Sequence, residues 1–244
     1  MFTQDDNNML LATPTKKEVE ETLKESNLHA APGTDGITSY TYKECWHILG
    51  DSLTEVARAV FDGHKPTTSQ RTSLMVFGAK PKKPHSLKPS DKRRKSLLNS
   101  DFKTITGIEA RRFKKVATHT LSPHQLVAGD NRRIHHGIAK ARDAIFAAGK
   151  QKNGCGILDT DYIAAFDWMV MNWVFMVLSK KGLSEQVIER LKNLYTENIS
   201  IVVVNNILGQ AIINHRLSVR QGDVQSMTWF GYVIDPLHFN RLNN

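Results

Sequence analysis

Residues 199–219 place the strongest constraint on the fold, because their pattern is that of a β-hairpin. Two runs rich in Ile and Val, ISIVVV and ILGQAII, flank Asn205 and Asn206. β-Branched residues favour strands, and Asn tolerates the backbone conformations that tight hairpin turns require. The chain is therefore expected to contain antiparallel strands close to its C-terminal end.

Helical periodicity dominates most of the remaining sequence. Apolar residues recur at helical spacing in residues 15–27, 46–61, 105–120, 134–148, 164–181, 184–195 and 224–237. Residues 72–102 predict two short strands joined by a long, proline-containing basic loop, and residues 157–161 predict another short strand. Helices and strands do not alternate regularly. We therefore predict an α+β fold that is rich in helices and has a small antiparallel sheet.

Length and composition narrow the class of protein further. The 244 residues suffice for one sizeable core with a smaller lobe. Cys45 and Cys155 are the only cysteines, which excludes a disulfide framework and a thiolate zinc site. The first residues do not resemble a secretory signal, and no apolar run has the length of a membrane span. We expect an intracellular protein that does not insert into membranes.

The positive charge of the chain is concentrated in one segment. The net charge is +9, and residues 80–115 contain thirteen Lys and Arg against three acidic residues, a local balance of +10. Such a concentration indicates contact with a polyanion such as nucleic acid. A solvated loop or a nuclear-import signal would also account for the run KRRK.

Three carboxylates lie close together in the stretch DTDYIAAFD, residues 159–167. Grouped carboxylates repel one another unless a cation or a turn requires them. Strand alternation places Asp159 and Asp161 on one face, at the end of the predicted strand. A metal ion is one explanation for this group, and helix capping or ion pairing by Asp167 is another.

Five stretches, in chain order, resemble the reverse transcriptases of non-LTR (LINE-type) retrotransposons. DTDYIAAFD resembles their motif A, and RQGDVQSM resembles their motif B. APGTDGI is similar to an early finger motif, KPKK…KRRKSLLNSDFK to the basic finger loop, and LSPHQLVAGDNRRIHHGI to a segment that follows it. The resemblance implies the right-hand fold of polymerases, with fingers and the first half of a palm. Residues 1–14 would be an N-terminal tail, residues 15–150 a fingers-like region with a basic loop at 80–115, and residues 151–244 a partial palm.

Position within these motifs implies roles for individual side chains. Asp161 would be the catalytic carboxylate and a ligand of Mg²⁺, which activates the primer hydroxyl and holds the triphosphate. Phe166 would be the steric gate that selects deoxynucleotides. The implied nucleotide-binding residues are Arg93, Phe166, Gln221 and Gly222, and the implied nucleic-acid-binding residues are Lys80, Lys82, Lys83, Arg94, Gln125 and Arg132. The implied partners are an RNA template, a DNA primer, deoxynucleotides and companion domains of a retrotransposon polyprotein.

The chain also departs from the family pattern. Asp223 and Val224 stand where motif B has Cys-Pro or a similar pair, and Arg94 and Lys95 replace Pro and Ile in the finger loop. The aromatic-x-Asp-Asp hairpin expected after motif B does not occur in these 244 residues. Two hypotheses follow. The chain is a reverse-transcriptase fragment truncated after motif B, an RNA-directed DNA polymerase by descent but catalytically incomplete. Alternatively, it is a non-catalytic nucleic-acid-binding or scaffolding module derived from a retrotransposon.

Overall fold

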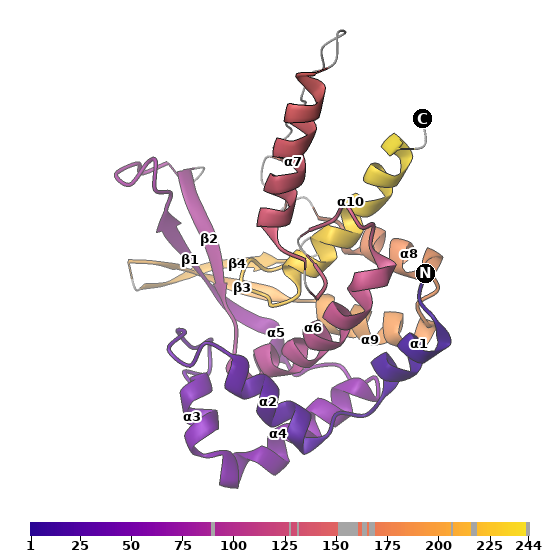
Figure 1. The fold of residues 1–244 in the computed structure, drawn as a ribbon. Helices are drawn as coiled ribbons and strands as arrows, with labels where there is room; N and C mark the ends of the chain where they lie inside the picture. Colours follow the sequence, from indigo (N-terminus) through magenta and orange to yellow (C-terminus); the bar gives the residue numbers. More distant parts are fainter. Residues whose placement is uncertain are drawn as a thin grey trace.

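A computed structural model describes residues 1–88, 91–126, 128–130, 132–150, 161, 162, 165, 169–205, 207–215 and 219–242, with only the backbone from residue 237 onward. The described part contains ten helices and four strands (Figure 1). The helices are α1 (Gln4–Leu11), α2 (Lys16–Glu25), α3 (Ser39–Glu44), α4 (Trp46–Phe61), α5 (Thr68–Arg71), α6 (Ser100–Thr120), α7 (Ile134–Ala148), α8 (Met171–Lys180), α9 (Glu185–Tyr195) and α10 (Ser226–Leu242). The strands are β1 (Thr72–Ala79), β2 (Lys92–Leu97), β3 (Ile199–Val204) and β4 (Ile207–Asn214).

The four strands form one sheet in the order β2-β1-β3-β4. Each of the two expected hairpins is present, since β1 pairs with β2 and β3 pairs with β4 in antiparallel fashion. We expected a small antiparallel sheet, and the observed sheet is instead mixed, because β1 and β3 run parallel with Thr72 opposite Ile199. The helical segments between these strands supply the long connection that parallel pairing needs. A buried contact of 2.6 Å between the hydroxyls of Ser73 and Ser200 joins the two hairpins.

Helix α6 forms the centre of the core. Its inner face buries Phe102, Ile105, Ile108, Phe113 and Val116, and it packs against α1, α2, α4 and α10. An aromatic group completes this core where Phe113 meets the Trp229 ring edge to face, with 5.0 Å between their centroids. Such pairs contribute to stability beyond the apolar area that they bury.

The first residues form part of this core, whereas we expected a tail over residues 1–14. Thr3 caps α1, and the side chain of Leu10 is fully buried. The Asn7 side chain donates to the carbonyl oxygen of Gly182 and accepts from the Ser184 amide. Burial of apolar groups together with these long-range hydrogen bonds fixes the segment.

Two buried arginines join the N-terminal helix to the rest of the core. Arg190 pairs with Glu109, and these side chains are 1% and 0% exposed. Arg112 pairs with Glu18, and each guanidinium also donates to the carbonyl oxygen of Leu10. Both guanidinium groups lie over the Phe61 ring, at 4.3 Å for Arg190 and 4.9 Å for Arg112. Pairing of this kind lowers the cost of burying a charge, although the second carboxylate oxygen of Glu109 has no hydrogen-bond partner among the described residues.

Some element boundaries differ from the expected ones. The helix predicted from residue 164 begins at Met171, and the last helix begins at Ser226 and continues to Leu242. Most of the strand predicted at 157–161 lies outside the described residues; Asp161 itself is in neither a helix nor a strand. Among the described helices, none is both long enough and apolar enough to cross a membrane. The division into fingers and palm stays a prediction.

Candidate nucleic-acid interface

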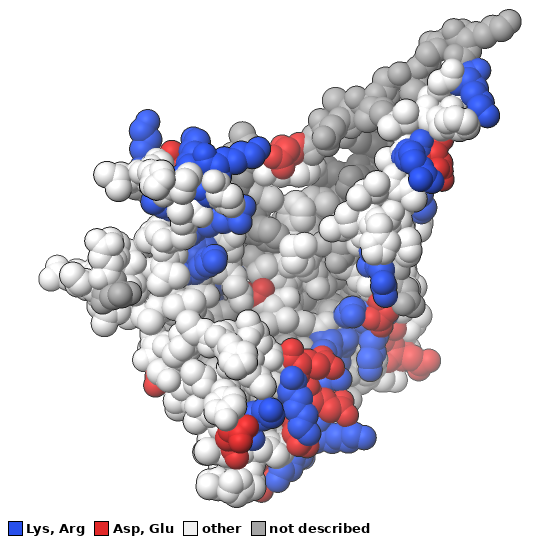
Figure 2. Space-filling view, turned by 60° about the vertical axis from the view of Figure 1, so that its left-hand side comes forward, with Lys and Arg blue, Asp and Glu red and all other residues white. Residues whose placement is uncertain are grey.

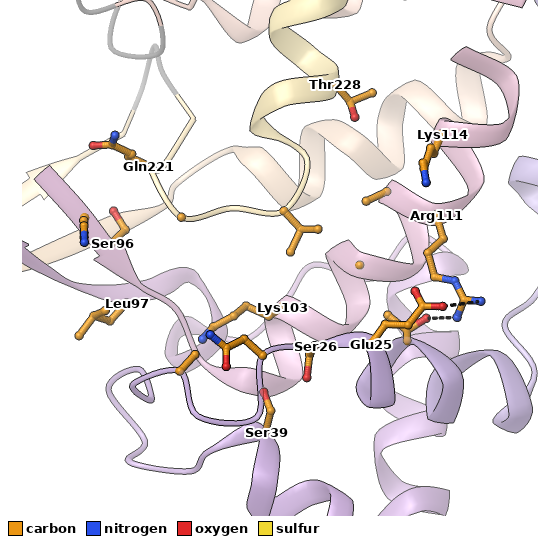
Figure 3. Close-up of a pocket in the computed structure, with 18 of the residues that line it drawn as sticks. Glu25, Ser26, Ser39, Ser96, Leu97, Lys103, Arg111, Lys114, Gln221 and Thr228 are labelled. Atoms are coloured by element: carbon orange, nitrogen blue, oxygen red, sulfur yellow. Dashed lines mark hydrogen bonds and ion pairs between the residues drawn. The ribbon is translucent and has the colours of Figure 1, made fainter. Parts of the chain in front are cut away.

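A pocket of about 890 Å³ opens between α2, α6, β2 and the turn before α10 (Figure 3). Helix α6 lines it with Lys103, Gly107, Ala110, Arg111 and Lys114, which share one face because they are spaced by three or four residues. Small residues in the middle of this face leave the space, and cationic residues stand at its ends. Gln221 lies across the pocket from Arg111 and Lys114 (Figure 3).

Four of the five sequence motifs meet at this pocket. The early finger motif supplies Ala31, and the basic finger segment supplies Lys95, Ser96, Leu97 and Lys103. The segment after α6 supplies Ala128, Gly129 and Arg132, and the motif-B-like segment supplies Gln221, Gly222 and Val224. These stretches are far apart in sequence. Of the residues to which the resemblance implied a role, Arg132, Gln221 and Gly222 line the pocket.

The motif-B-like turn, at Gln221 and Gly222, is held directly against strand β2. The Ser96 amide donates to the carbonyl oxygen of Gln221 at 2.7 Å. Gly222 has a φ of +130°, and a Cβ at this position would lie 2.5 Å from the carbonyl oxygen of Ser96. Only glycine permits both this conformation and this approach. The glycine thus serves contact with β2, a role that its place in the motif did not indicate.

Asn99, which the sequence reading did not single out, fastens the early finger motif to the base of the pocket. Its side-chain oxygen accepts from the Thr34 hydroxyl at 3.2 Å, and its amide nitrogen donates to the backbone and side chain of Ser69. A Cβ on Gly33 would come within 2.1 Å of the Asn99 side-chain oxygen. An Asn directly after a basic segment and before a helix was the available sequence signal.

Strand β2 presents cations on both of its faces. Residues in a strand alternate between faces, so Arg93 lies on the same face as Lys95, which lines the pocket. Both side chains are exposed. Arg94 is also exposed but belongs to the opposite face, beside Phe77 of β1. The two predicted finger-loop arginines therefore point to different sides of the sheet.

Lys80, Lys82 and Lys83 lie at the far end of the β1–β2 hairpin, where Figure 2 shows Lys and Arg gathered at the upper left. Lys83 is partly engaged, because its amine lies 2.7 Å from Asp91. The hydrogen bonds from Lys83 and then Ser86 hold the pKa of the Asp91 carboxyl below its ordinary value. The outer part of the hairpin keeps a strong excess of positive charge.

The expectation of one basic loop over residues 80–115 is wrong, because β2 and most of α6 lie within it. In the part of this segment that belongs to α6, acidic partners neutralise most of the positive charge. Arg112 pairs with Glu18, Arg111 with Glu21 and Glu25, and Lys114 with Asp130. Blue and red side chains are mixed in the lower part of Figure 2. The usable cationic surface is therefore the hairpin and its pocket-facing side.

Burial affects one further cation in the pocket. The pKa of Lys103 is lowered because the amine is partly removed from water, which Asp35 opposes electrostatically. Its amine lies 3.5 Å from the carbonyl oxygen of Ala31, so it remains close to the early finger motif. A partly desolvated amine gains more than an exposed one when an anion approaches.

Gln125 and Arg132 have structural roles in this conformation. The Arg132 guanidinium donates to four carbonyl oxygens, those of Thr118, Leu121, Ser122 and Gln125. It thereby satisfies the end of α6, whose last carbonyl groups have no partner within the helix. The Gln125 side chain is buried. Template contact by either residue stays a prediction.

The metal site implied by motif A is only partly described. Asp161 is exposed, and Phe166, Asp159 and Asp167 lie outside the described residues. No group of three or more His, Cys, Asp or Glu within the described ranges is arranged to hold a metal ion. One carboxylate is too few ligands for the pair of Mg²⁺ ions used in nucleotidyl transfer. Binding of Mg²⁺ therefore stays a prediction.

Comparison with known proteins gives one informative similarity. No protein-family model matches the chain. The chain is 26% identical over 228 residues to the transposon TX1 uncharacterized 149 kDa protein of Xenopus laevis. The match covers 93% of this chain and 17% of that protein. The similarity supports an origin of this chain in a transposon.

Proposed function

We propose that this chain is a reverse-transcriptase-derived domain of a retrotransposon protein, which binds single-stranded nucleic acid along the β1–β2 hairpin and the adjoining pocket. It is an RNA-directed DNA polymerase domain by descent. The function proposed for the 244 residues themselves is binding, because the aromatic-x-Asp-Asp element that would complete a two-metal site does not occur in them.

The meeting of four motifs at one pocket is the observation that carries this proposal. Their order along the chain was the basis of the resemblance, and order alone does not require the motifs to touch. Contact among them, and the glycine needed where the motif-B-like turn meets β2, support a common ancestry with polymerases. The similarity to a transposon-encoded protein supports the same origin.

Charge and shape support nucleic acid as the ligand. Arg93 and Lys95 form a cationic row on the pocket-facing side of β2, and Lys80 and Lys82 continue it toward the hairpin end. Lysine and arginine along a groove engage phosphates without reading sequence. We therefore expect the affinity to fall steeply with salt concentration and to differ little among bases.

Titration of a labelled RNA of about 16 nucleotides, followed by fluorescence anisotropy at several salt concentrations, tests the proposal. If four cations contact phosphates, the logarithm of the affinity should fall with the logarithm of salt with a slope of about −3. Replacing Arg93 and Lys95 together with Ala should weaken binding and reduce the slope by about 1.4. The charge-matched control replaces Lys180 and Lys192 with Ala, on α8 and α9, and should change the slope by less.

Two outcomes would contradict the proposal. Binding that does not change with salt would show that phosphates are not the contacts. An equal loss in the control variant would show that net charge, and not the face of β2, determines affinity.

A further inference from the structure

Beneath the motif-B-like turn lies a buried polar cluster that the proposed binding surface does not use. Asp223, Gln225 and Arg220 are 6%, 0% and 2% exposed, and Tyr195 of α9 is 4% exposed. Gln221 and Gly222, by contrast, are exposed toward the pocket. The turn therefore has one side that faces the pocket and one side that is sealed in the core.

Tyr195 is the centre of this cluster. Its hydroxyl donates to the side-chain oxygen of Gln225 at 2.7 Å and lies 3.3 Å from the nearer carboxylate oxygen of Asp223. That same carboxylate oxygen accepts from the backbone amide of Gln225 at 2.9 Å. The Tyr195 and Asp223 side chains together with Gln225 therefore close a small ring of contacts around the residues that immediately follow the turn.

Arg220 is the residue immediately before the turn, and its side chain holds it in place. Its guanidinium donates to the carbonyl oxygen of Arg71 at 3.0 Å and lies over the Phe102 ring at 4.6 Å from the centroid. The Asp223 amide donates to the Arg220 carbonyl oxygen at 3.0 Å, which closes the turn itself. On the outer side, Ser96 holds the carbonyl oxygen of Gln221. The turn is thus fixed at both ends and from two sides.

The cluster is energetically demanding. The second carboxylate oxygen of Asp223 and the side-chain amide nitrogen of Gln225 are buried with no hydrogen-bond partner among the described residues. Burial of a carboxylate with one oxygen unpaired is costly. Burial raises the pKa of this carboxyl, and the nearby Arg220 guanidinium opposes that rise. Such an arrangement is expected where a function requires it, because apolar packing would be more stable.

We propose that Tyr195 and Asp223 are positioning residues, which hold the Gln221–Gly222 turn in the orientation that shapes the pocket for nucleic acid. This inference rests on the proposed function for its ligand. The geometry of the turn carries it independently, because the contacts of Tyr195 with Asp223 and of Ser96 with Gln221 hold the turn from its two sides.

Tyr195→Phe removes one hydroxyl and leaves the ring in place. Loss of the hydrogen bond should weaken binding of the RNA by about three- to tenfold. Tyr232→Phe is the matched control, since the Tyr232 hydroxyl makes a buried 2.6 Å contact with Thr120 and, among the residues that the structure describes, no hydrogen bond to the turn. Its affinity should equal that of the wild type. Asp223→Ala should act like Tyr195→Phe, whereas Asp223→Asn keeps an accepting oxygen and should bind like the wild type.

Two further measurements separate positioning from a general loss of stability. In a background of Gln221→Ala, Tyr195→Phe should have no additional effect on affinity, because residues that act through one another are not additive. Amide exchange at Ser96, which donates to Gln221, should be faster in Tyr195→Phe than in the wild type or in Tyr232→Phe.

Unchanged exchange at Ser96 would overturn the inference, as would equal losses of affinity in the two tyrosine variants. If the wild type does not bind RNA at all, the proposed function fails. The exchange experiment then still decides whether this cluster positions the turn.

Discussion

Gly222 offers the most direct test of how the turn and β2 depend on each other. In Gly222→Ala the new Cβ would meet the Ser96 carbonyl oxygen at 2.5 Å, so the turn has to move by about half an ångström or more. The hydrogen bond from the Ser96 amide to Gln221, now 2.7 Å long, lies on the same contact and lengthens with it. An alanine at a φ of +130° is strained in addition.

These two effects give the expected magnitude. Left-handed backbone strain costs about 1–2 kcal/mol for a residue with a Cβ. Weakening one hydrogen bond costs about 1 kcal/mol more. The free energy of unfolding should therefore fall by about 2–3 kcal/mol, which corresponds to a melting temperature lower by about 4–12 °C in a chain of this size.

Gly36→Ala is the matched control. Gly36 also has a positive φ, +73°, but a Cβ there would have no atom within 4 Å. Only the backbone strain of about 1–2 kcal/mol should appear. Urea unfolding followed by circular dichroism gives both free energies, and RNA anisotropy gives both affinities. We expect only Gly222→Ala to lose affinity. Equal destabilisation and equal affinity in the two variants would refute the contact between the turn and β2 as the cause.

Two other predictions concern buried charge. Glu109→Ala leaves the guanidinium of Arg190 buried without its carboxylate and should lower the free energy of unfolding by about 3–5 kcal/mol; Lys192→Ala on the same helix as Arg190 should change it by no more than about 0.5 kcal/mol in the same urea titration. Because burial raises the pKa of Asp223 above its ordinary value of 3.8, the folded protein holds this proton more tightly, and stability from this group is lost as pH rises from about 3.8 through the raised value. Asp223→Asn should therefore become more stable relative to the wild type as pH increases across that window. A loss of stability of Asp223→Asn relative to the wild type over the same pH range would show that the fold favours the charged carboxylate.

Local pattern predicted much of the secondary structure. Residues 46–61 and 134–148 are helices with the expected bounds, and Asn205 with a φ of 51° lies at the turn of the β3–β4 hairpin. These features depend on residues that are neighbours in sequence, so periodicity and turn chemistry determine them. The parallel pairing of β1 with β3 depends on two hairpins meeting after a long connection, and no local pattern encodes it.

The site was predictable in its parts but not in its assembly. Arg93, Gln221 and Gly222 were identified from motif position, and the pocket has Gln221 and Gly222 among its lining residues. The roles of Lys103 and Asn99 could not be derived, since each depends on which segment packs across from it. Charge counting likewise overestimated the available cations, because acidic partners such as Glu18 come from a distant helix.

Strand β2 is the element on which the pocket depends. It pairs with β1 along one edge, receives the motif-B-like turn through Ser96, and leads through Asn99 to the early finger motif. Each of these contacts joins segments far apart in sequence, and non-local contacts of this kind are slow to form because loop closure must precede them. Helices such as α4 can form without them. Changes at the turn should therefore reduce binding before they reduce helical content, which makes affinity the more sensitive measure of whether this site has assembled.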